Sequence, residues 1–276
     1  MMRLCCLSLS FKAEFAARQL DDLRFIDLCA QLGLDGVDFN MGSFQSLERG
    51  HLKKIKKACV EHGLDISCIG ISNNFGRPPA EQEAVQQQIR QGIDAALFLG
   101  APVVRVFAGY VRNGATREQV WKQTVEGLKR AGDYAEKAGV MIGLQNHNHT
   151  NIAGTGEDVA RLLKDVSHPW CEHILDTGQY LGSLGASGAQ ADEPRRFDVY
   201  KSIERTAPLA VMVRAKLYRL RNGREQWLDY DRIFKILRGV KYNGFVSLVY
   251  EGWQDMDAMH AVPVGVKFLR GFLAQR

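Results

Sequence analysis

Amphipathic helical segments that end in glycine and lead into short apolar strands repeat along the first half of the chain. The segments AQLGLDGVDF, VEHGLDISCI, LFLGAPVVRVF and EKAGVMIGLQ place Gly33, Gly63, Gly100 and Gly139 directly after a helix. Successive glycines are 30, 37 and 39 residues apart, and each interval accommodates one helix and one strand. The pattern therefore predicts repeated βα units.

Four further apolar segments read as strands, namely RLCCLSLSF near the start and CEHILD, LAVMVRAK and FVSLVYE later. Apolar residues at helical spacing predict helices over residues 18–32, 81–99 and 117–138. Thr116 with Gln119, and Thr155 with Asp158, have the form of capping boxes at helix starts. Because eight strands alternate with helices, we predict an α/β fold, a single (β/α)8 TIM barrel over residues 1–276.

Two loops interrupt the regular pattern. Residues 182–196, GSLGASGAQADEPRR, follow the sixth strand and are rich in Gly, Ala and Ser. They predict a mobile loop on the C-terminal face of the barrel, either a lid or a plain insertion. Asn222-Gly223, between alternating segments in KLYRLRNGREQW, predicts a tight hairpin after the seventh strand.

Composition narrows the class of protein. The 276 residues are 46% hydrophobic and 24% charged, as in an ordinary soluble globular protein. A net charge of +5 spread along the chain gives little support for a nucleic-acid partner. No apolar run approaches the roughly 18 residues of a membrane span, so no membrane partner is predicted. Six cysteines without C-x-x-C spacing are expected to be buried thiols of a cytoplasmic protein.

Polar residues at the strand ends are the candidates for chemistry, because the strands of such a barrel point their carboxyl ends at one shared pocket. Alternation places Gln145, His147 and His149 on one side of LQNHNH, where they could reach one metal ion or one sugar. The structural alternative is that backbone groups or solvent satisfy either histidine. The other candidates are Asp38, Asn40, Asn73, Asn74, Arg105, Asp176, Gln179, Arg214, Lys216 and Glu251.

Charged residues lie at the carboxyl ends of the last three predicted strands. Asp176 ends a buried strand, where an unpaired carboxylate is costly, so it needs a cation, a donor or a substrate unless it caps a loop. Arg214 and Lys216 alternate on VMVRAKLY and could bind an anion, stabilise an enolate or pair with acids. Glu251 in VYEGW is a candidate base or metal ligand, or an ion-pair partner of these two basic residues.

At these residues the chain resembles the xylose-isomerase-like superfamily of sugar phosphate isomerases, epimerases and related proteins. The resemblance covers almost the whole length and rests on LGLDGVDF, GVMIGLQNH, ILDTGQ, VRAK and YNGFVSLVYEG in this order. It implies a divalent metal, Mn, Mg, Zn or Co, whose ligands follow strands five to eight. It also implies a small sugar as the substrate.

The ligand positions that the resemblance implies are only partly kept. Asp176 stands where the family has Asp, but Gln145 takes the place of a Glu and Arg214 that of a His. A guanidinium cannot ligate a metal. Val249 matches the family's Glu of strand eight, although Glu251 follows with the same side-chain parity. Two arrangements are possible. Asp176, Gln145, Glu251 and a histidine hold a divalent ion in an atypical site, or the guanidinium of Arg214 takes the place of the ion.

The sequence thus predicts an intracellular enzyme that moves a proton next to the carbonyl of a monosaccharide or keto-sugar, by isomerisation, epimerisation or elimination. The predicted catalytic residues are Glu251, His147 and Lys216, and the predicted metal ligands are Asp176, Gln145 and Glu251. The predicted substrate-binding residues are Asn74, Arg105, His149, Gln179 and Arg214. The alternatives are a metal-free, catalytically silent sugar-binding or regulatory barrel and, last, an abasic-site endonuclease. Assembly into a homo-oligomer is left open.

Overall fold

The computed structural model describes residues 1–112, 114–185 and 196–274. Its parallel strands close into a barrel in the order β1-β10-β7-β6-β5-β4-β3-β2. The barrel strands are β1 (Arg3–Leu7), β2 (Gly36–Asn40), β3 (Asp65–Gly70), β4 (Val103–Phe107), β5 (Met141–Gln145), β6 (Cys171–Asp176), β7 (Ala210–Leu217) and β10 (Phe245–Tyr250). The predicted (β/α)8 barrel is confirmed.

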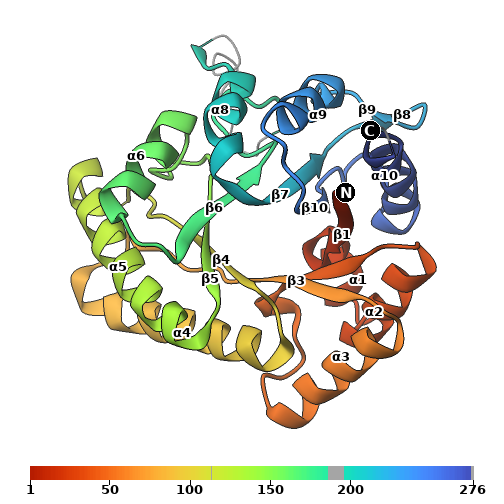
Figure 1. Ribbon diagram of the computed structural model, residues 1–276, viewed down its shortest axis with the longest axis horizontal. Helices are drawn as coiled ribbons and strands as arrows, with labels where there is room; N and C mark the ends of the chain where they lie inside the picture. The colour runs from red at the N-terminus through yellow and green to blue at the C-terminus, as the bar shows by residue number, and fades with distance from the viewer. Residues whose placement is uncertain (113, 186–195, 275–276) are drawn as a thin grey trace.

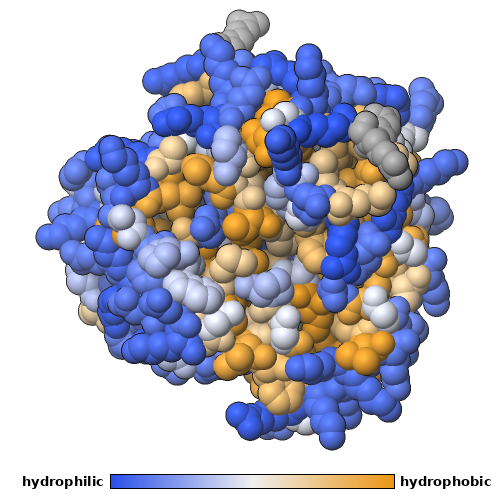
Figure 2. Space-filling model, in the orientation of Figure 1, coloured by the Kyte–Doolittle hydropathy of each residue, from blue (hydrophilic) through white to orange (hydrophobic). Residues whose placement is uncertain are grey.

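Helices surround the barrel on its outside (Figure 1). They are α1 (Lys12–Ala16), α2 (Asp22–Gln31), α3 (Arg49–Glu61), α4 (Gln82–Leu99), α5 (Arg117–Ala138), α6 (Gly156–Val166), α8 (Val199–Thr206), α9 (Tyr230–Gly239) and α10 (Ala258–Leu273). In Figure 2, apolar side chains gather at the middle of the face shown, inside a rim of hydrophilic ones. Among the described residues, no helix has the length and apolar character needed to cross a membrane.

Local signals in the sequence set most helix ends. The predicted helix over 117–138 matches α5, and the Thr116 and Thr155 capping boxes both form. Gly33, Gly63, Gly100 and Gly139 all adopt positive φ, between 64° and 86°, as expected after a helix. The helix predicted over 18–32 is shorter, because the Asp21 carboxylate accepts from the backbone N–H of Leu23 and Arg24 and so caps α2.

The two predicted loops have different outcomes. The predicted hairpin forms from β8 (Leu220–Arg221) and β9 (Arg224–Glu225), which pair antiparallel around Asn222-Gly223. Of the loop predicted over 182–196, residues 186–195 lie outside the described part of the chain. Its mobility therefore stays a prediction.

The barrel interior divides into an apolar layer and a polar layer. The apolar layer contains Cys5, Cys68, Val103, Ile174 and Met212. On β4, β6 and β7 the next residue of the same side-chain parity, two positions further along, belongs to a polar layer. It contains Asp38, Arg105, Gln145, Asp176, Arg214 and Ser247, all of which are buried.

The cysteines behave as small apolar residues. All six are free and buried, as predicted. Burial raises the pKa of the Cys68 thiol to about 12, so this thiol is protonated and unreactive at neutral pH.

Candidate functional site

A polar network crosses the barrel interior from β2 to β7, near the carboxyl ends of the strands. Arg214 donates from Nε and Nη2 to the two carboxylate oxygens of Asp38, at 3.0 and 2.8 Å. Ser247 on β10 donates to the same carboxylate at 2.9 Å. Burial alone would lower the pKa of Arg214, but the negative charge of Asp38 raises it. The guanidinium is therefore a fixed positive charge inside the barrel.

Gln145, the last residue of β5, links this pair to Asp176, the last residue of β6. Its Oε1 accepts from Arg214 Nη1 at 2.9 Å, and its Nε2 donates to Asp176 Oδ2 at 2.8 Å. A guanidinium can only donate and a carboxylate can only accept, so these neighbours fix the orientation of the amide. The amide oxygen faces Arg214, and the amide nitrogen faces Asp176.

Lys216 lies between two carboxylates at the ends of the strands. Its Nζ is 3.3 Å from Asp176 Oδ2 and 2.9 Å from Glu251 Oε1. Asp176 Oδ1 also accepts from the backbone N–H of Gly178 at 3.0 Å, and Gln179 Nε2 donates to Glu251 Oε2 at 3.3 Å. The side chain of Glu251 is 15% exposed, whereas that of Asp176 is fully buried. Glu251 is thus the carboxylate of the two that a ligand can reach.

The two carboxylates differ in acidity because their surroundings differ. Burial raises the pKa of Asp176, against the opposing charge of Lys216. Burial would also raise the pKa of Glu251, but the charge and hydrogen bond of Lys216, with smaller effects of His147 and Lys12, lower it below its usual value. Glu251 is therefore ionised at neutral pH and able to accept a proton.

An aromatic cluster lies at the ends of β4 and β5. The ring of His147 is 5.0 Å from that of Phe107, 5.8 Å from that of Tyr110 and 5.5 Å from that of His149, measured between centroids. All four residues are partly exposed. Partly exposed rings that line a polar site offer a surface against which the C–H face of a sugar can pack.

The histidines lie beyond the strand on which the sequence placed them. β5 ends at Gln145, and His149 has a positive φ of 54°, so strand alternation does not continue to His147 and His149. Burial lowers the pKa of His147 to about 4, with a smaller contribution from the charge of Lys216. The His147 imidazole is therefore neutral at pH 7.

Arg105 and Asn74, both predicted to bind substrate, are engaged within the protein. Arg105 is 2% exposed, donates from Nη1 to the carbonyl of Ile71 and lies over the ring of Phe107, with Cζ 4.0 Å from the ring centroid. Its Nε has no hydrogen-bond partner among the described residues. Asn74 Oδ1 accepts from two backbone N–H groups, at 2.8 and 3.0 Å. Both side chains thus bind groups of the protein near the carboxyl ends of β3 and β4. Their contact with a sugar stays a prediction.

The two remaining candidates, Asn40 and Asn73, hold strand ends in place. Asn73 exchanges two hydrogen bonds with the backbone of Phe107, its Nδ2 donating at 2.8 Å and its Oδ1 accepting at 2.7 Å. The backbone N–H of Asn40 donates to the hydroxyl of Ser8 at 2.9 Å, and its carbonyl accepts from the hydroxyl of Ser43 at 2.7 Å. The Asn40 contacts join the ends of β1 and β2, and the Asn73 contacts join the loop after β3 to the end of β4.

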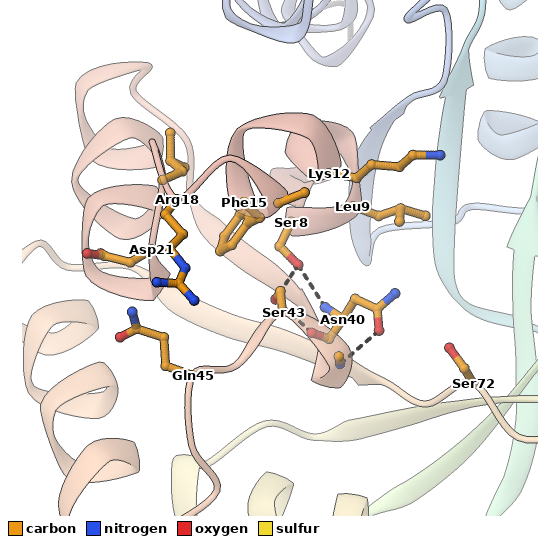
Figure 3. A pocket seen from close by; sticks show the side chains of 13 residues that line it. Ser8, Leu9, Lys12, Phe15, Arg18, Asp21, Asn40, Ser43, Gln45 and Ser72 are labelled. Carbon is orange, nitrogen blue, oxygen red and sulfur yellow. Dashed lines mark hydrogen bonds between the residues drawn. The ribbon is translucent and has the colours of Figure 1, made fainter.

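A cavity of about 710 Å³ opens where β1, β2 and β3 end. Figure 3 shows Ser8, Ser43 and Asn40 joined by hydrogen bonds in its wall. Lys12 also lines the cavity, and its positive charge contributes to the low pKa of Glu251. Gln145, Asp176, Lys216 and Glu251 are not among the residues that line this cavity.

The side chains at the ends of the strands do not fit the divalent metal that the resemblance implies. Gln145 turns its nitrogen toward Asp176, and reversing the amide would set two donors, its own NH₂ and Arg214, against each other. Both oxygens of Asp176 already accept hydrogen bonds or an ion pair. Val249, in register with Lys216 and fully buried, offers no ligand atom. Within the described ranges, no group of three or more His, Cys, Asp or Glu residues could hold an ion.

The fold is a closed (β/α)8 barrel, and its polar residues gather at the carboxyl ends of the strands. The chain belongs to the xylose isomerase-like TIM barrel family, whose model matches residues 26–271. No curated protein matches the sequence.

Solved structures of similar fold carry sugar epimerase names. A 3-keto-D-glucoside 4-epimerase from E. coli has a TM-score of 0.75 at 17% identity, over 98% of this chain and 100% of that one. A D-tagatose 3-epimerase-like protein has a TM-score of 0.77 at 16% identity, over 99% and 97%. A D-allulose 3-epimerase from Methylomonas sp., in complex with D-allulose, has a TM-score of 0.71 at 18% identity, over 97% and 90%. At these identities the likeness shows the fold.

Some residues at the site escaped the sequence analysis. Ser247 and Phe107 lie on the inward parity of β10 and β4, so the alternation that located Arg105 could have located them. Lys12 begins α1 and Tyr110 lies in the loop after β4, and the sequence carries no comparable signal at either position. The hydrogen bonds of Ser247 and the ring contacts of Phe107 appear only in three dimensions.

Proposed function

We propose that the protein binds a monosaccharide or keto-sugar at the carboxyl ends of its strands and moves a proton on a carbon next to the sugar carbonyl. The observation that carries the proposal is the contact of 2.9 Å between Lys216 Nζ and Glu251 Oε1 at the partly exposed edge of a buried network. An ionised carboxylate beside a fixed ammonium is an acid–base pair suited to enolisation.

In the proposed step, Glu251 takes a proton from the carbon next to the carbonyl. The electron pair of the broken C–H bond forms the C=C bond of an enediolate, and the carbonyl oxygen becomes an oxyanion that the Lys216 ammonium stabilises. Delivery of a proton to the former carbonyl carbon, with transfer of the hydroxyl proton to the other oxygen, gives isomerisation. Delivery of a proton to the original carbon from the opposite face gives epimerisation, and departure of a group on the neighbouring carbon gives elimination. His147 is proposed to complete the proton transfers or to contact the sugar.

The other predicted site residues take supporting roles in this proposal. Gln179 Oε1 is buried without a hydrogen-bond partner among the described residues, so it is a candidate acceptor for a sugar hydroxyl. His149 contributes to the aromatic surface at the mouth. Arg214 and Arg105, which are 1% and 2% exposed, act from beneath the site through their charge. In this proposal Asp176 and Gln145, which the sequence predicts as metal ligands, position Lys216 and Arg214.

Proton exchange in deuterated water tests the proposal. Protein treated with EDTA should introduce deuterium next to the carbonyl of at least one member of a panel of ketoses and 3-keto-glycosides, chosen because the similar folds carry such names. Glu251→Gln should lower the exchange rate by about 10²–10⁴-fold. Glu204→Gln, on the exposed side of α8, is the matched control and should exchange at the wild-type rate. Absence of label across the panel contradicts the proposed reaction.

A second candidate is a sugar-binding barrel without catalysis. It is favoured by one observation, the replacement of family ligand positions by Gln145, Arg214 and Val249. Calorimetric binding of a sugar at micromolar affinity, together with no deuterium exchange of that sugar, would support this candidate over the enzyme. The cytoplasmic location and any homo-oligomer stay predictions.

A further inference from the structure

We infer that the Lys216 ammonium takes the place of the divalent cation in this barrel, so that the site is complete without a metal ion. This deepens the proposed function, since it names the group that supplies positive charge at the reacting oxygen. It rests on contacts within the protein, and metal analysis can therefore test it separately from turnover.

The position of Lys216 is the first observation. Its ammonium contacts both Asp176, the carboxylate at a family ligand position, and Glu251, the carboxylate that follows β10. The Lys216 side chain is 3% exposed, and the Asp176 side chain is fully buried. An ammonium held between two carboxylates in a buried site compensates their negative charge, as a metal ion would.

The charge balance of the layer is the second observation. Asp38, Asp176 and Glu251 carry three negative charges, and Arg105, Arg214 and Lys216 carry three positive charges in the same part of the barrel. A divalent ion added to this set would leave two positive charges uncompensated in a buried region, which is costly. The charges of these six side chains therefore sum to zero without a metal ion.

The third observation is that Lys216, and not Arg214, contacts Asp176. Arg214 replaces the family's histidine ligand, but its guanidinium turns to Asp38 and to Gln145 Oε1. No contact of less than 4.0 Å joins Arg214 to Asp176 among the ion pairs of the described residues, whereas Lys216 contacts Asp176 directly. Arg214 thus orients Gln145 so that its NH₂ supports the Asp176–Lys216 contact.

Metal content and chelator response of the wild-type protein form the first test. Purified protein should contain far less than one divalent ion per chain by plasma mass spectrometry. Its midpoint of thermal unfolding should be the same with EDTA and with Mn²⁺, Mg²⁺, Zn²⁺ or Co²⁺. About one tightly bound ion per chain, with a lower midpoint after its removal, would overturn the inference. Failure to find a sugar substrate would leave this result unaffected.

Substitution of Lys216 is the second test. Lys216→Ala opens space between Asp176 and Glu251, so Mn²⁺ at about 100 times its Kd should raise the unfolding midpoint by roughly 5 °C. Lys216→Met also removes the charge but fills the space, and it should gain no response to Mn²⁺. Lys201→Ala, on the exposed side of α8, controls for loss of a lysine. A Lys216→Ala protein that responds to none of the four ions would also overturn the inference.

Discussion

Arg214 on β7 donates two hydrogen bonds to the carboxylate of Asp38 on β2, although 176 positions separate the two residues in sequence. Both side chains are 2% exposed or less. Two further strands, β10 and β1, lie between β7 and β2 around the barrel. The pair therefore spans the interior and joins the first quarter of the chain to the last.

Loss of Arg214 is expected to destabilise the barrel strongly. Arg214→Met leaves the Asp38 carboxylate buried without its cation, which should lower the free energy of unfolding by about 3–5 kcal/mol. The double variant Arg214→Met with Asp38→Asn removes the unpaired charge and should recover part of the loss. Urea unfolding followed by circular dichroism measures both. Arg221→Met, which breaks an exposed pair with Asp255, should change stability little. Equal losses of unfolding free energy in Arg214→Met and Arg221→Met would refute the role given to Arg214.

Stability should depend on pH through His173. Burial lowers the pKa of this imidazole to about 4, and its Nδ1 lies 2.9 Å from the carbonyl of Leu144, while Nε2 lies 3.0 Å from the hydroxyl of Tyr180. The unfolded chain binds a proton below about pH 6.5 and the folded chain does not. The contribution of the neutral His173 imidazole to the free energy of unfolding is therefore complete above pH 6.5. It is lost as the pH falls from 6.5 toward 4, by about 3 kcal/mol in all.

His173→Gln isolates this contribution. A glutamine amide can donate to the Leu144 carbonyl and accept from Tyr180, but it does not titrate, so the variant should show a flatter fall of stability between pH 6.5 and 4. Chemical denaturation at half-unit pH steps provides the measurement. His62→Gln on the exposed surface is the control. An unchanged slope in His173→Gln would show that other groups govern this pH range.

Gly127 in α5 and Gly271 in α10 should respond oppositely to substitution by alanine. A Cβ at Gly127 would lie 2.4 Å from a ring carbon of Phe75, so Gly127→Ala should cost about 1–3 kcal/mol through overpacking. At Gly271 a Cβ meets nothing within 4 Å, and Gly271→Ala should stabilise the protein by about 0.5–1 kcal/mol through helix propensity. Thermal unfolding compares the two variants directly. A stabilising Gly127→Ala would show that the helix can move away from Phe75.

The start of α5 depends on the Thr116 side chain. Its hydroxyl accepts from the backbone N–H of Gln119 at 3.2 Å, and the Gln119 side chain accepts from the N–H of Thr116 at 2.9 Å. Thr116→Ala should therefore lower the free energy of unfolding by about 1 kcal/mol, whereas Thr116→Ser, which keeps the hydroxyl, should lose little. Urea unfolding of both variants gives the comparison, and equal losses would contradict a capping effect.

The sequence by itself determined the barrel, because the signals that specify it are local. Glycines that accept positive φ after helices, the capping boxes at Thr116 and Thr155 and the apolar strand segments each act within a few residues. The sequence also located Asp176, Lys216 and Glu251 at strand ends, since parity and position within a strand follow from the order of residues. These features needed no knowledge of distant contacts.

Only the tertiary structure decided which of these groups meet. Closure of the barrel brings Arg214 to Asp38 and leaves Lys216 to the carboxylates of Asp176 and Glu251, a choice between two basic residues that share one strand. It also fixes the Gln145 amide with its nitrogen toward Asp176. Charge pairing across a closed sheet depends on distances between residues far apart in sequence, and local patterns carry no information about those distances.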